Sequence, residues 1–105
     1  IKIKRIHFAW DNPEQNLRSY FEKFRKKCDL NYSKLGVYVL VNFNSTQEQD
    51  LERVYFLRDL GYDPYVMVYE KETAPREIKL LQRWVNNRFI FRSCPRFEDY
   101  DPRRR

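Results

Sequence analysis

Strand-like segments, each followed by a helix-like segment, recur along this chain at intervals of about 30 residues, the length of one βαβ unit. The strands begin near residues 3, 36 and 64. The helical segments between them leave no room for a hairpin, so neighbouring strands must run in the same direction. The repeat therefore predicts an α/β fold of three βα units, with a parallel sheet and right-handed crossovers.

The first unit opens with residues 1–10, which alternate early and are mostly β-branched or aromatic, as strands are. Asn12 and Pro13 then supply a helix N-cap and a proline at the first helical position. We expect a helix from there. Its apolar stripe comprises Leu17, Tyr20, Phe21, Phe24 and Cys28.

The second unit contains a continuous apolar run over residues 35–41, which is typical of a central strand covered on both faces. Two overlapping capping boxes follow, Ser45 with Glu48 or Thr46 with Gln49, and either one starts a helix. Gly61 is placed to end that helix in a left-handed C-cap. The expected inner face comprises Leu51, Val54, Tyr55, Arg58 and Leu60.

The third unit has a strand over residues 65–69 and a helix start at residues 73–75, where a threonine cap again precedes a proline. The helix stripe comprises Ile78, Leu81, Trp84, Val85 and Phe89. We therefore assign residues 1–91 to a single βαβαβα domain. Residues 92–105 mix prolines with charges and predict an irregular basic tail.

Composition narrows the class of protein. The chain has 105 residues, 42% of them hydrophobic and 17% aromatic, which is too apolar for a disordered segment. Its apolar runs fall far short of the roughly 20 residues that cross a bilayer, so we expect a soluble, cytoplasmic protein. The two cysteines, Cys28 and Cys94, lack metal-ligand spacing and are expected to be reduced thiols.

The sequence lacks the residues that several classes of enzyme require. His7, the single histidine, lies within the first strand without a nearby nucleophile, which disfavours a hydrolase triad and predicts a histidine satisfied by its neighbours. With only two glycines, both outside the strand-to-helix turns, the chain has neither a phosphate loop nor a dinucleotide fingerprint. The net charge of +6 comes from scattered positions, so solvated faces and a basic tail explain it better than nucleic-acid binding.

Ligands of parallel sheets bind at the carboxyl ends of the strands, where helix N-termini and loop amides converge. Three segments end strands in this way: residues 10–12, 42–45 and 69–71. Most of their polar side chains suit helix capping. Asp11 and Asn42 precede the expected caps and are the better candidates for a cleft.

Residues 6–11, 39–51 and 60–69 (IHFAWD, VLVNFNSTQEQDL and LGYDPYVMVY) resemble the C-terminal half of a radical SAM barrel, and RWVN at residues 83–86 resembles an uncharacterised bacterial subgroup. The resemblance implies a TIM-like partial barrel of which this chain would form the fourth to sixth βα units. Asn42 stands where the family's fifth strand usually reaches a glycine.

Members of this family bind a 4Fe–4S cluster through a CxxxCxxC loop and use it to cleave S-adenosylmethionine to a radical. That loop is absent here, so the resemblance implies an oxidoreductase-like fragment that is not catalytically competent alone and holds no metal. It would supply part of the cofactor and substrate wall. Asp11 would lie near the ribose or amino acid end, Val41, Asn42 and Asn44 near the adenine, and Tyr69 toward the substrate.

The implied partner is the missing N-terminal half of the barrel. Three strands with all helices on one side leave the other face uncovered, and apolar faces do not stay wet. The isolated chain is therefore expected either to form a homodimer through that face or to rearrange so that helices cover both sides. The alternatives are a stand-alone α/β regulatory or protein-interaction module without enzyme activity and, third, an RNA-associated domain.

Overall fold

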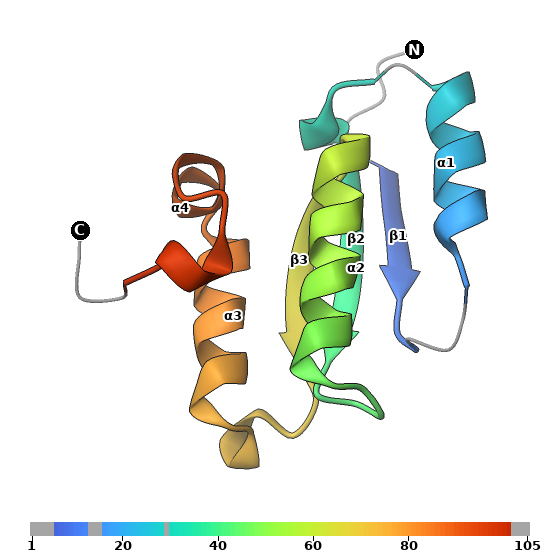
Figure 1. The fold of residues 1–105 in the computed structure, drawn as a ribbon. Helices are drawn as coiled ribbons and strands as arrows, with labels where there is room; N and C mark the ends of the chain where they lie inside the picture. The colour runs from blue at the N-terminus through green and yellow to red at the C-terminus, as the bar shows by residue number, and fades with distance from the viewer. Residues whose placement is uncertain (1–5, 13–15, 29, 102–105) are drawn as a thin grey trace.

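A computed structural model describes residues 6–12, 16–28 and 30–101. Its sheet contains β1 (Ile6–Trp10), β2 (Leu35–Val41) and β3 (Asp63–Val68), all parallel and in the order β1-β2-β3 (Figure 1). The parallel sheet and the alternating βα units confirm the predicted fold class. The part of the first strand predicted before Ile6 lies outside the described residues, as does Pro13.

The helices of the described chain follow the strands in turn. They are α1 (Arg18–Lys27), η1 (Tyr32–Lys34), α2 (Gln47–Leu60), η2 (Lys71–Thr73), α3 (Arg76–Asn86), α4 (Arg88–Ser93) and η3 (Phe97–Asp99). In Figure 1, α2 crosses in front of the sheet, with α1 beside β1 and α3 beside β3. The three long helices share one face of the sheet because right-handed crossovers between sequential strands place them there.

The core lies between that face and the helices. Val37, Val39 and Val41 point into it from β2, where Trp10 and Phe21 join them, and all five are buried. Phe8 and Trp10 pair in register with Val37 and Val39, so β1 presents the same alternation. The core is therefore a single layer of side chains on one side of the sheet.

The other face of the sheet is uncovered in the described structure. Tyr38, Tyr65 and Met67 are 37%, 46% and 50% exposed on it. The prediction that β2 is covered on both faces is therefore wrong, because every crossover helix lies on the valine side. The expected rearrangement with helices on both sides is not seen among the described residues either.

Local contacts mark both ends of α2 and the start of α1. Thr46 and Gln49 form the capping box of α2, and Gly61 ends that helix at φ 92°, as predicted. The start predicted for α1 at Asn12 and Pro13 is wrong: α1 begins at Arg18, whose N–H donates to Asn16 Oδ1 at 3.3 Å. Asparagine side chains often form such local hydrogen bonds, which compete with the backbone hydrogen bonds of a helix.

The C-terminal region is more regular than predicted. The domain boundary expected after residue 91 falls inside α4, and η3 follows within the predicted tail. Phe89 leaves the predicted stripe of α3 and is 80% exposed. The cause is Asn87, which ends α3 and caps α4 by accepting the Ile90 N–H at 3.1 Å. Residues 102–105 lie outside the described structure.

The outer edge of β3 is closed by α3. Asn86 Oδ1 accepts the Val66 N–H at 2.7 Å, and Asn86 Nδ2 donates to the Val66 carbonyl at 2.9 Å. Gln82 donates to the same carbonyl at 3.3 Å. Pro64, two residues earlier, has no N–H to offer. A further strand therefore finds no free partner around the middle of this edge.

Candidate functional site

The loops at the carboxyl ends of β2 and β3 contain left-handed backbone. Asn42, Asn44 and Glu70 have φ values of 61°, 51° and 46°, and they are the non-glycine residues with positive φ in the described chain. Such residues cost of order 1–3 kcal/mol each and cluster at functional sites. All three lie in segments that the sequence analysis selected as candidate binding loops.

Asn42 links the two loops to each other. Its Nδ2 donates to the Tyr69 carbonyl at 3.2 Å, and the Tyr69 N–H donates to the Val41 carbonyl at 3.1 Å. The rings of Phe43 and Tyr69 lie 4.9 Å apart, centroid to centroid. The carboxyl ends of β2 and β3 therefore form one connected rim.

A buried ion pair holds this rim from below. Asp50 and Arg53, both on α2 and both essentially unexposed, approach to 2.7 Å. Arg53 also donates to the carbonyls of Trp10 at 3.0 Å and Leu40 at 2.8 Å, and Asp50 accepts the Asn42 N–H at 3.3 Å. One pair thus joins the carboxyl ends of β1 and β2 to the strained loop.

Sequence reasoning missed this ion pair. The predicted inner face of α2 contains neither residue, because Asp50 and Arg53 lie outside the apolar spacing on which it is based. Asp50 and Arg53 are three positions apart and flank the apolar stripe, as a salt-bridged surface pair would. The sequence carries no separate signal that both side chains turn inward.

The predicted site residues lie around this rim. Asp11 and Asn44 are exposed, Tyr69 is 42% exposed, and Asn42 is half-buried. The Val41 side chain is fully buried among the core valines. A ligand at the rim would therefore meet Val41 only through its backbone, whose carbonyl already accepts the Tyr69 N–H.

One hydroxyl of the same loop has no protein partner. Ser45 Oγ is buried, and no hydrogen bond to it is formed within the described chain. A buried hydroxyl without a partner costs about 1–3 kcal/mol, so it is poised to accept or donate a hydrogen bond. This adds a third polar group, beside Asn42 and Asn44, to the β2–α2 loop.

The uncovered face adjoins the rim and carries one charged side chain on its strands, Asp63, which is buried at the start of β3. Its other side chains, from β1 to β3, are His7, Ala9, Tyr38, Leu40, Tyr65 and Met67. The whole sequence is 34% charged, so the exposed side chains of these strands are depleted of charge. His7 is exposed rather than enclosed, and its ring stacks on Tyr38 at 5.5 Å and 15°. Depletion of charge is typical of surfaces that become covered.

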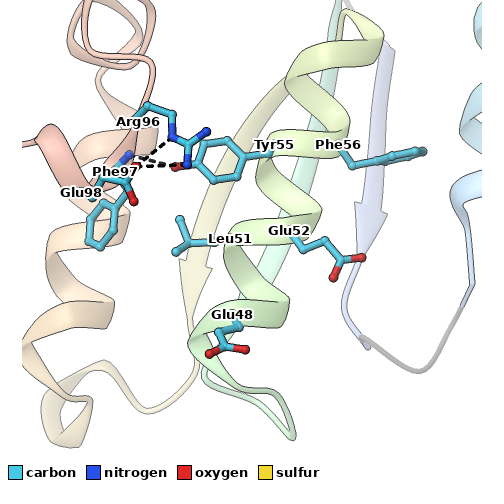
Figure 2. Close-up of a pocket in the computed structure, with 8 residues that line it drawn as sticks. All are labelled: Glu48, Leu51, Glu52, Tyr55, Phe56, Arg96, Phe97 and Glu98. Carbon is cyan, nitrogen blue, oxygen red and sulfur yellow. Dashed lines mark hydrogen bonds and ion pairs between the residues drawn. The ribbon is translucent and has the colours of Figure 1, made fainter.

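A second concave region lies on the helical side, between α2 and η3 (Figure 2). Leu51 and Tyr55 of α2 form its apolar wall opposite Phe97, and its volume is about 650 Å³. The Phe97 N–H donates to the Tyr55 hydroxyl at 2.9 Å, and Arg58 donates to the Pro95 carbonyl at 2.6 Å. These contacts attach the C-terminal segment to α2.

The part of the chain that the structure describes contains no group of three or more histidine, cysteine or acidic side chains that could hold a metal ion. Cys28 is the C-cap of α1 and Cys94 the C-cap of α4, and both are free thiols. No described helix combines the length and apolarity needed to span a bilayer.

Comparison with known proteins identifies no relative: no family model, no curated protein and no solved structure matches the chain.

Proposed function

We propose that this chain is the C-terminal half of a radical SAM oxidoreductase-like barrel, and that its rim forms part of the wall around S-adenosylmethionine and substrate. The observation that carries the proposal is the difference between the two edges of the sheet. The β3 edge is closed by Asn86. Beside β1, the described residues place no further strand.

Because of this difference, the sheet can be extended at the β1 edge only. Additional strands can pair beside β1 but not at the middle of β3, as expected of the last units of a barrel whose earlier strands precede β1. The uncovered face, rich in aromatic residues, then corresponds to the interior of the barrel, which packed side chains and ligand fill. In such barrels the site lies at the carboxyl ends of the strands.

The polar groups of the rim suit S-adenosylmethionine. Amide and hydroxyl groups from Asn42, Asn44 and Ser45 match the donors and acceptors of an adenine edge and a ribose. Asp11, exposed at the end of β1, suits the ribose or the ammonium group of the amino acid end. Tyr69, from the adjoining loop, would face the substrate.

An iron–sulfur cluster does not fit this chain. Its two cysteines, Cys28 and Cys94, are 66 positions apart and fewer than the three of a CxxxCxxC loop, so the ligands of a 4Fe–4S cluster would have to come from residues outside this sequence. The cluster would supply the electron that cleaves S-adenosylmethionine. The residues described here would bind and orient the cofactor and the substrate and exclude water from them.

The test is to determine the coding sequence upstream of Ile1 and to reconstitute the longer protein anaerobically with iron and sulfide. We expect a CxxxCxxC sequence there and a cluster absorbance that changes when S-adenosylmethionine is added. Asp11→Ala and Asn42→Ala should each weaken S-adenosylmethionine binding by about tenfold, the equivalent of one hydrogen bond of about 1.4 kcal/mol.

Matched controls separate binding from folding. Asp59→Ala removes an exposed carboxylate near the end of α2, and Asn87→Ala removes an asparagine at α4, so both should leave the affinity unchanged. If neither Asp11→Ala nor Asn42→Ala alters the affinity, the proposed site is wrong. A longer protein without the cysteine loop would refute the half-barrel itself.

A further inference from the structure

A hollow of about 660 Å³ opens at the amino-terminal end of β3, on the uncovered side of the sheet. It lies at the opposite end of the strands from the rim, so the two regions can be tested separately. Its walls come from β1, β2, β3 and the α3–α4 junction. Its volume is within the range of small-molecule sites, about 300–1,000 Å³.

Aromatic rings from all three strands line this hollow. His7 stacks on Tyr38 with centroids 5.5 Å apart, and Tyr38 meets Tyr65 edge to face at 5.8 Å. All three side chains are exposed, with Tyr65 at 46%. Exposed aromatic side chains accept planar groups by stacking or by edge-to-face contact.

The charged groups of the hollow determine whether its ligand is an anion or a cation. Arg88 donates to Asp63 at 2.8 Å, yet the two side chains differ in access, since Arg88 is 48% exposed and Asp63 only 10%. Asn86 is the remaining polar neighbour, and its side-chain amide is already hydrogen-bonded to Val66. The accessible charge is therefore the guanidinium, whose planar fork suits a carboxylate or phosphate.

We propose that this hollow binds a planar aromatic anion, with the ring against Tyr38 and Tyr65 and the anionic group on Arg88. A second copy of the chain is a poorer occupant of the face. Three strands about 5 Å apart and about five residues long give roughly 250 Å² of sheet. A stable dimer buries about 800 Å² on each partner.

The test uses the 105-residue chain and three probes of the same shape: 2-naphthoate, neutral 2-naphthamide and cationic 2-naphthylmethylamine. Backbone amide shifts measured by NMR should move at His7, Tyr38 and Tyr65. Naphthoate should bind about fivefold more tightly than naphthamide, as expected for one solvent-exposed charged contact. The amine should bind most weakly.

Variants separate the ring contacts from the charge contact. Arg88→Gln should abolish the preference for naphthoate and Arg88→Lys should retain most of it, whereas Tyr38→Leu should weaken the binding of both probes. Arg76→Gln, an exposed arginine at the start of α3, is the control and should change nothing. Unchanged amide spectra report that each variant is folded.

Three results would overturn the proposal. If naphthamide binds as tightly as naphthoate, Arg88 does not bind the anionic group. Shifts that map to the groove beside Leu51 rather than to Tyr38 would relocate the site. Concentration-dependent broadening of Tyr38 and Tyr65, with a dimer in sedimentation, would show that a second copy covers the face.

Discussion

The side-chain amide of Asn86 lies against Val66 as the backbone of a fourth strand would, accepting its N–H at 2.7 Å and donating to its carbonyl at 2.9 Å. A helix thereby completes the hydrogen bonding of a sheet edge. Unpaired edges are sites of strand addition and aggregation, and natural proteins protect them. The sheet is consequently protected on one side while β1 stays an edge strand.

Replacing Asn86 should open the β3 edge. Asn86→Ala leaves the Val66 N–H without its partner and the Val66 carbonyl with Gln82 alone, and we expect a loss of about 1–3 kcal/mol in the free energy of unfolding. Self-association should rise as well, which sedimentation velocity would detect. Asn87→Ala, the neighbouring asparagine, removes only the cap of α4 and should cost about 1 kcal/mol without association. Equal association of the two variants would contradict the role of Asn86.

The Asp50–Arg53 pair should behave as a unit. Arg53→Met strands a buried carboxylate and should cost about 3–5 kcal/mol in chemical denaturation. Asp50→Asn should cost a similar amount, because it leaves the guanidinium without its counter-ion. The double variant should be more stable than the sum of the two losses predicts. Strict additivity would mean that the ion pair contributes no coupling.

The left-handed backbone at Asn44 predicts how three substitutions there rank by their effect on the free energy of unfolding. A β-branched residue at φ 51° is strained, so Asn44→Val should lower the free energy of unfolding by about 1–2 kcal/mol. Asn44→Gly relieves the strain but loses more chain entropy on folding, and because the two effects offset each other it should be neutral within a few tenths of a kcal/mol. Asn44→Asp should have a free energy of unfolding close to that of the parent protein. Thermal unfolding of the three variants gives the order, and a stable valine variant would show that the loop relaxes.

Tyr62 links stability to alkaline pH. Its side chain is buried and its hydroxyl donates to the Phe21 carbonyl at 2.8 Å. Burial raises the pKa of Tyr62 to about 12, although the nearby Arg25 acts in the opposite direction. The folded state therefore keeps the neutral phenol after the unfolded chain has ionised, so the stability that it contributes is complete below pH 10 and is lost as pH rises toward 12.

Tyr62→Phe isolates this effect from the other tyrosines. At neutral pH the variant should lose about 1 kcal/mol, the worth of one hydrogen bond. Between pH 10 and 12 its stability should fall less steeply than that of the parent, as measured by urea denaturation at each pH. Parallel pH profiles for the two proteins would show that Tyr62 does not ionise differently on folding.

The features predicted correctly are those that local backbone chemistry determines. The capping box of Thr46 with Gln49 and the left-handed Gly61 each depend on a few adjacent residues, and the structure confirms both. The parallel order follows from the length of the repeat. Asn42 is a candidate from its place after a strand and Asn44 from the resemblance to radical SAM barrels, and the left-handed backbone of both has no sequence signal.

The features predicted incorrectly depend on the rest of the fold. An apolar strand such as β2 looks the same whether one or both faces are covered, since aromatic residues such as Tyr38 also occur in cores. Asp50 and Arg53 read as surface charges because their partners are backbone carbonyls and amides supplied by distant segments. Such pairings follow from topology and not from the order of residues.

The closure of the β3 edge also has a consequence for synthesis on the ribosome. Val66 and Asn86 are separated by 20 residues, so β3 is translated well before the side chain that protects it. At about 5–20 residues per second, the nascent chain exposes this edge for roughly 1–4 seconds. Within that interval a chaperone or a neighbouring nascent chain competes with α3 for the strand, and the efficiency of folding in the cell depends on which arrives first.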